Sequence, residues 1–127
     1  MQTSRDTNEL SETQILNWEE IEPVYSQEGL PSPRTGFSME QINGQIVIFG
    51  GSNNDTVLGD FWIYEISKNI WKKAEPTKKI SERSGSKSFV FEDRMYIYGG
   101  YTQRGGDYYN ELFYFDPKSL ETEYIKK

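Results

Sequence analysis

The stretch Ile46-Val47-Ile48-Phe49-Gly50-Gly51 decides the fold, because the chain repeats it 49 positions later as Met95-Tyr96-Ile97-Tyr98-Gly99-Gly100. Each copy places four large apolar residues before a glycine pair, which predicts a strand buried on both faces that ends at the glycines. A second anchor has the same shift, since Arg34-Thr35-Gly36 returns as Arg83-Ser84-Gly85. The chain therefore contains two copies of one unit, and each copy is expected to form the same structural element.

Within each copy the pattern predicts four short strands. Asn43-Gly44 is a strong signal for a tight hairpin turn, because both turn residues must accept positive φ. Ser67-Lys68-Asn69 marks a second turn. No helical periodicity competes over this region, and the second copy repeats the pattern from Ser84 to about Ile125. The strands expected in the first copy are 35–42, 45–49, 60–66 and 70–74.

The two glycine pairs carry a backbone prediction. At least one glycine in each of Gly50-Gly51 and Gly99-Gly100 is expected to adopt a conformation that other residues resist, or to permit close approach of another segment. Downstream, Leu58–Glu65 aligns with Tyr109–Asp116 at a shift of 51. The second copy therefore carries two extra residues in the loop after its glycines.

The composition of this 127-residue chain excludes several chemistries. It has no cysteine and no histidine, which rules out a disulfide framework, a cysteine zinc site, a thiol nucleophile and a Ser-His-Asp triad. The formal net charge of −6 disfavours duplex nucleic acid, whose phosphates require a basic surface. No cofactor and no metal ion are expected, since Ser52-Asn53-Asn54-Asp55 lacks the acidic spacing of a calcium loop.

The sequence predicts a soluble, cytoplasmic protein that does not bind membranes. Its polar start lacks the apolar run of a signal peptide. No stretch approaches the roughly 18 apolar residues that a membrane span requires. Residues 1–16 are expected to form a polar, flexible N-terminal tail.

An apolar tetrad before a glycine pair, followed by Tyr64 and Trp71 with six residues between them, resembles the kelch motif, and the period near 50 residues also fits. The resemblance covers residues 17–127. It implies an all-β fold, a kelch-type β-propeller segment with two four-stranded antiparallel blades in an incomplete ring. Trp71 is then expected to be buried between sheets. The second copy departs from the family pattern, because Phe115 stands at the tyrosine position and Thr122 at the tryptophan position.

The repeat divides the rest of the chain into a first unit at 17–76 and a second unit at 77–127. The first unit begins with residues 17–21, which include Trp18 and resemble the fourth strand of an upstream blade whose other strands are missing. Two blades leave two outer faces uncovered. The chain is therefore expected to be a fragment of a longer propeller, or else to close a ring with other chains, and three copies would supply six blades.

Loops at one end of the blades are expected to carry function, because binding residues concentrate on loops held by a rigid scaffold. Arg34 and Arg83 occupy equivalent places at this end. One interpretation is a pair of guanidiniums that bind a carboxylate or an acidic peptide. The other is that each arginine braces the adjacent loop or neighbouring blade through hydrogen bonds to carbonyl groups. Recurrence at the repeat spacing favours the bracing interpretation.

The longer loop Tyr101–Tyr109 combines tyrosine, arginine and glycine, a composition typical of binding hot spots. Tyr101, Arg104 and Tyr108 are therefore candidate partner-binding residues, together with the two arginines described above. The predicted function is a non-enzymatic protein–protein interaction module that presents its inter-strand loops to a protein partner.

The alternative is a fragment of a carbohydrate-active propeller enzyme that uses carboxylates. Acids do recur at equivalent positions, Asp60 with Glu111 and Glu65 with Asp116. That periodicity indicates roles in turns and at strand edges rather than a single active site. A buried pair of acids converging in a cleft would favour the enzyme.

Overall fold

The computed structural model describes residues 17–24, 28–54, 56–102 and 107–126, and the expected tail at 1–16 lies outside these ranges. The described residues form eight strands and no helix. The first four strands are β1 (Ser38–Ile42), β2 (Gln45–Asn53), β3 (Thr56–Glu65) and β4 (Ile70–Ala74). The next four are β5 (Lys87–Phe91), β6 (Arg94–Tyr98), β7 (Leu112–Phe115) and β8 (Thr122–Lys126).

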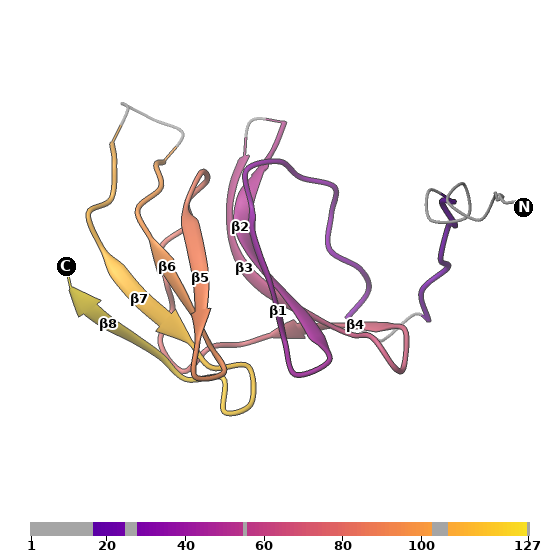
Figure 1. The fold of residues 1–127 in the computed structure, drawn as a ribbon. Helices are drawn as coiled ribbons and strands as arrows, with labels where there is room; N and C mark the ends of the chain where they lie inside the picture. Colours follow the sequence, from indigo (N-terminus) through magenta and orange to yellow (C-terminus); the bar gives the residue numbers. More distant parts are fainter. Residues whose placement is uncertain (1–16, 25–27, 55, 103–106, 127) are drawn as a thin grey trace, which may run out of the picture.

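The strands pair as two separate antiparallel sheets, β1-β2-β3-β4 and β5-β6-β7-β8, which we call blade 1 and blade 2. Every strand pairs with its neighbour in sequence, as short hairpin connections favour. Figure 1 shows the blades standing side by side without closing a ring. The prediction of an all-β segment with two four-stranded antiparallel blades is confirmed. In the described part of the chain, no helix is long and apolar enough to cross a membrane.

Strand β2 is longer than the sequence predicts, because its pairing continues through the glycine pair. Phe49 pairs with Phe61, and pairing resumes at Gly51 with Leu58 after a bulge. A bulge bends a strand while keeping it in the sheet, so the glycines of blade 1 kink β2 rather than end it. In blade 2 the corresponding strand β6 does end at Tyr98, directly before its glycines.

The backbone prediction for the glycine pairs is confirmed. Gly50 and Gly51 have φ values of 69° and 100°, and Gly99 and Gly100 have values of 76° and 102°. A Cβ atom on Gly50 would lie 2.5 Å from the carbonyl oxygen of Arg83. The glycines of blade 1 therefore let β2 approach the linker between the blades, where the Gly51 amide donates to the Arg83 carbonyl at 2.9 Å.

The hydrophobic core lies between the two blades. Ring centroids are 5.7 Å apart for Phe49 and Phe113, and 4.2 Å apart for Phe61 and Phe115. None of these four side chains is more than 1% exposed, and burying one aromatic side chain contributes about 1.5–3 kcal/mol. The core is completed by Ile42, Val47, Ile63, Ala74, Ile80, Met95 and Ile97.

Trp71 does not lie in this core. It pairs across β3 and β4 with Tyr64, and the two ring centroids are 5.0 Å apart. Because Ile63 faces blade 2, the alternation of side chains along β3 turns Tyr64 to the opposite face. Trp71 shares that face and is only partly buried. The prediction that Trp71 is buried between two sheets is wrong for this chain, because no second sheet of the described residues covers that face.

The expected strand around Trp18 does not form, and this side chain is 98% exposed. The chain joins blade 1 at Val24, whose amide donates to the carbonyl of Asn69 at 2.7 Å. The linker between the blades makes the equivalent contact, since the Thr77 amide donates to the carbonyl of Leu120 at 2.9 Å. The segment around Trp18 therefore precedes blade 1 as β4 precedes blade 2, but the described residues provide no strand for it to pair with.

The face of blade 2 that points away from blade 1 carries exposed aromatic side chains. Phe89 is 52% exposed, Phe91 57% and Tyr98 49%. Ring centroids are 5.1 Å apart for Phe89 and Tyr96, and 5.8 Å apart for Tyr96 and Tyr114. We call these five residues the open face. A contiguous apolar surface of this kind is typical of an interaction surface.

Candidate functional site

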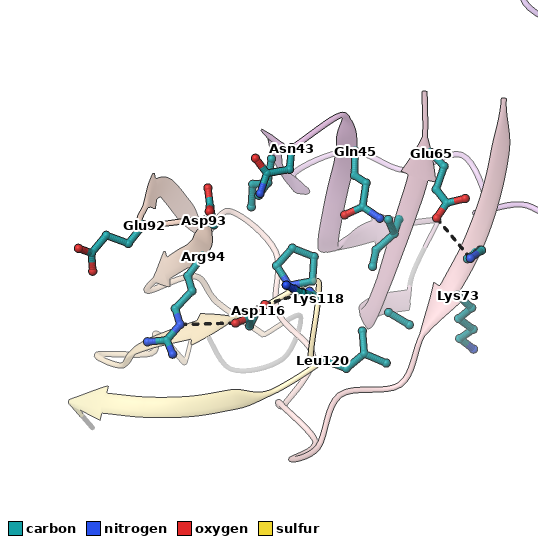
Figure 2. Close-up of a pocket in the computed structure, with 15 residues that line it drawn as sticks. Asn43, Gln45, Glu65, Lys73, Glu92, Asp93, Arg94, Asp116, Lys118 and Leu120 are labelled. Carbon is teal, nitrogen blue, oxygen red and sulfur yellow. Dashed lines mark hydrogen bonds and ion pairs between the residues drawn. The ribbon is translucent and has the colours of Figure 1, made fainter. Parts of the chain in front are cut away.

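The blades have two different ends (Figure 1). At the turn end, tight turns connect β1 to β2 and β5 to β6. At the loop end, longer connections join β2 to β3 and β6 to β7, and the segments that precede β1 and β5 arrive. The candidate residues from the sequence belong to the loop end. At the turn end, a groove of about 900 Å³ lies between the blades, and we call it the inter-blade groove (Figure 2).

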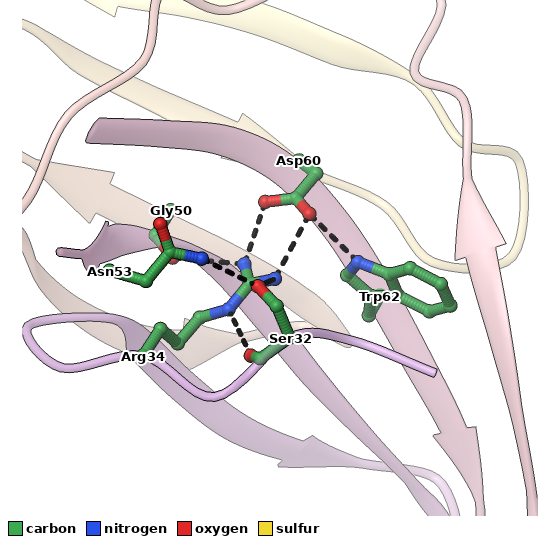
Figure 3. A network of polar contacts seen from close by, with 6 residues as sticks. All are labelled: Ser32, Arg34, Gly50, Asn53, Asp60 and Trp62. Atoms are coloured by element: carbon green, nitrogen blue, oxygen red, sulfur yellow. Dashed lines mark hydrogen bonds and ion pairs between the residues drawn. The ribbon is translucent and has the colours of Figure 1, made fainter. Parts of the chain in front are cut away.

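At the loop end, Arg34 is turned into blade 1 (Figure 3). Its Nη1 donates to Asp60 Oδ1 at 2.7 Å, and its Nη2 donates to Asp60 Oδ2 at 3.1 Å. Its Nε donates to the Ser32 carbonyl at 3.0 Å, and Nη1 also donates to the Gly50 carbonyl at 3.2 Å. A guanidinium suits such two-point binding of a carboxylate. Arg34 therefore ties the segment before β1 to strands β2 and β3.

Asp60 receives a further hydrogen bond, because Trp62 Nε1 donates to its Oδ2 at 2.8 Å. Burial by itself would raise the pKa of Asp60. The hydrogen bonds from Arg34 and Trp62, together with the charge of Arg34, outweigh burial and hold the pKa below its ordinary value of 3.8. The carboxylate therefore stays ionised throughout the neutral pH range.

Arg83 has the equivalent position in blade 2, and its side chain is fully buried. Its Nη2 donates to Glu111 Oε1 at 2.9 Å, and its Nε donates to the carbonyl of Ser81 at 3.0 Å. The guanidinium carbon lies 3.8 Å from the centroid of the Tyr109 ring, which is cation–π geometry. These contacts match the bracing interpretation, because both guanidiniums point into the scaffold rather than into solvent.

Tyr101 and Tyr108 come together at the loop end. Their ring centroids are 6.1 Å apart with an edge-to-face angle of 60°, and Tyr108 is 80% exposed. The Tyr101 backbone bonds to Ser84 in both directions, at 2.9 and 3.0 Å. A Cβ atom on Gly85 would lie 2.7 Å from the Tyr101 ring, so this ring rests directly on the glycine. Arg104 lies outside the described residues.

The assignment of Asp60 and Glu111 to turns and strand edges is wrong, because each acid binds the arginine of its own repeat copy. The separation is 26 residues for Arg34 and Asp60, and 28 for Arg83 and Glu111. The difference of two equals the insertion in the second copy. An arginine and an acid that recur together at the repeat spacing were therefore the signal, visible in the sequence, for these two ion pairs.

Glu65 and Asp116 occur at equivalent positions and both line the inter-blade groove. Asp116 has the predicted turn role, since its Oδ1 accepts the amides of Lys118 at 2.9 Å and Ser119 at 3.4 Å. Its other oxygen lies 3.7 Å from Arg94 Nε. Among the described residues, no group of three acidic side chains could hold a metal ion. Of these two repeat-equivalent acids, one thus already serves the fold.

Two four-stranded antiparallel sheets, stacked face to face and joined by one linker, define this chain as a segment of a β-propeller. The repeat, its glycine pairs and the spacing of Tyr64 and Trp71 indicate the kind of propeller. The chain belongs to the kelch-repeat family, and the KLHDC2/KLHL20/DRC7 Kelch-repeats domain matches residues 2–127.

Several curated proteins are similar to parts of the chain. Kelch-like protein 25 of Homo sapiens is 35% identical over 78 residues, which cover 61% of this chain and 13% of that protein. The leucine-zipper-like transcriptional regulator 1 homolog of Drosophila melanogaster is 33% identical over 94 residues, covering 69% of this chain and 10% of its own length. Kelch-like protein 33 of Homo sapiens is 28% identical over 104 residues, or 80% of this chain and 17% of that protein. The chain thus spans a small part of the length of its relatives.

Proposed function

We propose that this chain is a non-enzymatic interaction segment of a kelch propeller that contacts a protein partner through its loop end. The observation that carries the proposal is the edge-to-face pair of Tyr101 and Tyr108, with Tyr108 80% exposed. Tyrosine supplies a large contact area and loses little conformational entropy on binding. An exposed tyrosine pair held by backbone hydrogen bonds next to the sheet is therefore a strong candidate for a hot spot.

The scaffold beneath the pair is fixed by named contacts. Tyr101 is held by its two backbone hydrogen bonds to Ser84. Arg83, the residue before Ser84, is held by Glu111 and Tyr109. A rigid support lowers the entropy that is lost when a partner binds. In this proposal Arg34 and Arg83 shape the surface from beneath, while Tyr101, Tyr108 and Arg104 touch the partner.

We further propose that the chain works as part of a larger assembly, either the remaining blades of a longer polypeptide or other copies of this chain. The support is the open face, where Phe89 is 52% exposed and Phe91 57%. In blade 1 the equivalent side is covered by blade 2. A further blade would cover the open face in the same way.

The loop-end proposal can be tested by site-specific photocrosslinking. Tyr108→p-benzoylphenylalanine in the 127-residue chain should form a discrete crosslink with a protein from the source cells. Ser67→p-benzoylphenylalanine, at an exposed turn-end position outside the inter-blade groove, is the matched control and should not form that crosslink. The crosslinked protein is then purified, and its affinity is measured for wild type, Tyr108→Phe and the double variant Tyr101→Ala/Tyr108→Ala.

The double variant should bind at least tenfold more weakly, since hot-spot residues contribute about 2 kcal/mol or more each. Tyr108→Phe keeps the ring and should remain within about threefold of wild type, a difference below 1 kcal/mol. Equal crosslinking from both ends, or equal affinity of the double variant, would contradict the proposal.

A further inference from the structure

The inter-blade groove at the turn end is built from both repeat copies, which is why neither copy alone reveals it. Blade 1 contributes the ends of β1 and β3 and most of β4, and blade 2 contributes the β5–β6 and β7–β8 turns. Ile42 and Ile63 are at most 5% exposed and form an apolar floor, which Ala74 and Leu120 extend. A volume of about 900 Å³ exceeds that of a single side chain and falls in the range of ligand sites.

Glu65 differs from its repeat equivalent Asp116 in what its carboxylate does. Asp116 is occupied by the amides of its own turn. Both turns are closed by an equivalent backbone hydrogen bond, from the Asn69 amide to the Glu65 carbonyl at 2.8 Å and from the Leu120 amide to the Asp116 carbonyl at 2.7 Å. Among the described residues, only the Asp116 carboxylate also accepts amides of its turn. The Glu65 carboxylate is therefore not needed for its turn, and it lines the groove (Figure 2).

One oxygen of this carboxylate lacks a hydrogen-bond donor among the described residues. Glu65 Oε1 is buried without a hydrogen bond, and the closest charge, Lys68 Nζ, lies 3.7 Å away on a side chain that is 71% exposed. Lys72 Nζ lies 3.3 Å from the other oxygen, Oε2. A buried carboxylate oxygen without a donor is unfavourable, so the Glu65 carboxylate gains a hydrogen bond if it rotates this oxygen toward a donor that a ligand brings into the groove.

We propose that the inter-blade groove binds a lysine or arginine side chain of a partner peptide, with Glu65 Oε1 accepting a hydrogen bond from the cationic head. The aliphatic stem of such a side chain would pack on Ile63, Ala74 and Leu120, because these stems bury readily against apolar surface. The Gln45 amide also lines the groove and can bond the peptide backbone. The chain's net charge of −6 attracts a cationic peptide over a longer distance.

The charged side chains around the groove limit which peptides it can bind. Lys72, Lys73 and Lys118 line the groove together with the acids Glu92 and Asp93, so positive and negative side chains around it balance. Arg94 is already engaged, 3.7 Å from Asp116 and 4.2 Å from the centroid of the Tyr114 ring. The lining therefore gives further charges of either sign no net attraction, and a single basic side chain at Glu65 is the contact that the groove favours.

The test measures fluorescence polarisation of fluorescein-Gly-Ala-Arg-Ala-Gly-amide titrated with the 127-residue chain, in whatever state of association the chain adopts. The comparison peptide carries citrulline in place of arginine, which keeps the shape and removes the charge. Wild type should bind the arginine peptide saturably and the citrulline peptide at least tenfold more weakly. Binding should also weaken as salt rises, because the interaction is ionic.

Three variants locate the site. Glu65→Gln should weaken binding of the arginine peptide at least tenfold. Glu75→Gln is the matched control, since it removes the same charge at an exposed position outside the groove, and it should stay within twofold. Lys72→Gln should strengthen binding, because it removes the closer of the two lysine ammonium groups that lie within 4 Å of the Glu65 carboxylate.

Circular dichroism first checks that wild type is folded. If folded wild type shows no saturable binding of the arginine peptide up to about 1 mM, the weak end of useful affinity, the proposal is overturned. Equal binding of the citrulline peptide, or equal loss in Glu65→Gln and Glu75→Gln, would also overturn it. If Glu65→Gln does not fold, Lys72→Gln decides, and unchanged or weaker binding by that variant contradicts the proposal.

Discussion

Side chains at equivalent positions of β2 in blade 1 and β6 in blade 2 differ in how far they are buried. Val47 and Phe49 of β2 face blade 2 and are 0% and 1% exposed. Their repeat equivalents on β6, Tyr96 and Tyr98, belong to the open face, where Tyr98 is 49% exposed. At these two positions, burial therefore follows the presence of a neighbouring sheet rather than the place within the repeat.

The residue types on the two faces match this difference in burial. The covered face of blade 1 uses valine, isoleucine and phenylalanine, whereas the open face carries Tyr96, Tyr98 and Tyr114. A tyrosine ring can pack against a sheet while its hydroxyl bonds to water or to a polar partner. The open face is thus both apolar enough to dock and polar enough to tolerate solvent.

The largest expected effect concerns the open face as a whole. Folding costs roughly 1–2 kcal/mol of backbone entropy per residue, and two blades have one shared core to offset that cost. We expect the isolated chain to associate, aggregate or unfold in part rather than to persist as a stable monomer. Sedimentation and thermal melts at several concentrations measure this, and a monodisperse monomer with a cooperative, concentration-independent melt would contradict it.

The second prediction compares one side chain from each face. Phe61→Ala should lower the free energy of unfolding by about 3–5 kcal/mol, because Phe61 is fully buried and stacks on Phe115. Phe89→Ala, on the open face, should cost no more than about 1 kcal/mol. Urea denaturation measures both. An equally large loss for Phe89→Ala would show that another sheet covers the open face in solution.

The third prediction compares the glycine pairs. A Cβ atom on Gly50 would lie 2.5 Å from the Arg83 carbonyl, whereas a Cβ atom on Gly99 would meet its nearest neighbour, the Tyr109 carbonyl, at 3.8 Å. Both glycines have positive φ, which costs other residues about 1–2 kcal/mol. Gly99→Ala should show this cost alone in denaturant titrations. Gly50→Ala should cost at least about 1 kcal/mol more, and equal losses would argue against the close approach.

The smallest expected effect concerns the ion pair of Arg34 and Asp60 in blade 1. Asp60→Asn should cost about 1–2 kcal/mol at neutral pH, since it weakens charge-assisted hydrogen bonds to a side chain that is 3% exposed. The pKa of Asp60 is lowered from 3.8 in the folded chain, so its stabilisation is complete above that value and is lost as the pH falls through the folded pKa.

Wild type and Asp60→Asn should therefore differ by a constant amount above about pH 5 and converge at lower pH. Urea midpoints measured across pH 2–7, a window spanning the pKa values of carboxyl groups, check this convergence. A difference between the two proteins that did not change on acidification would exclude Asp60 as the titrating anchor.

Local signals predicted the fold well. The Asn43-Gly44 turn and the glycine pairs depend on backbone conformations that few other residues accept, so each can be recognised within a single stretch of sequence. The burial of Trp71 was predicted wrongly because it requires a neighbouring sheet. The sequence pattern shows on which face of a sheet a side chain lies, but not whether another sheet packs on that face. The anchors of Arg34 and Arg83 were recognisable only when the acids were aligned together with the arginines.

The inter-blade groove lay beyond sequence reasoning for a different reason. It forms where Glu65 of one copy faces the turns of the other, and the repeat pattern describes each copy rather than the space between them. The same pattern suggested that Glu65 and Asp116 act alike. Both turns close through the same backbone hydrogen bond, but only the Asp116 carboxylate also accepts amides of its turn among the described residues.

The stacking of blade 2 on blade 1 has a consequence for symmetry. Blade 1 presents Val47 and Phe49 to the contact, while blade 2 presents Met95 and Ile97, which are equivalent to Ile46 and Ile48 on the opposite face of blade 1. Such a contact is heterologous, and copies that associate through it are related head to tail rather than by a two-fold axis. A dimer formed in this way always leaves two faces uncovered, one at each end. Growth then stops only when the rotation per copy closes a ring, and otherwise continues as a fibre.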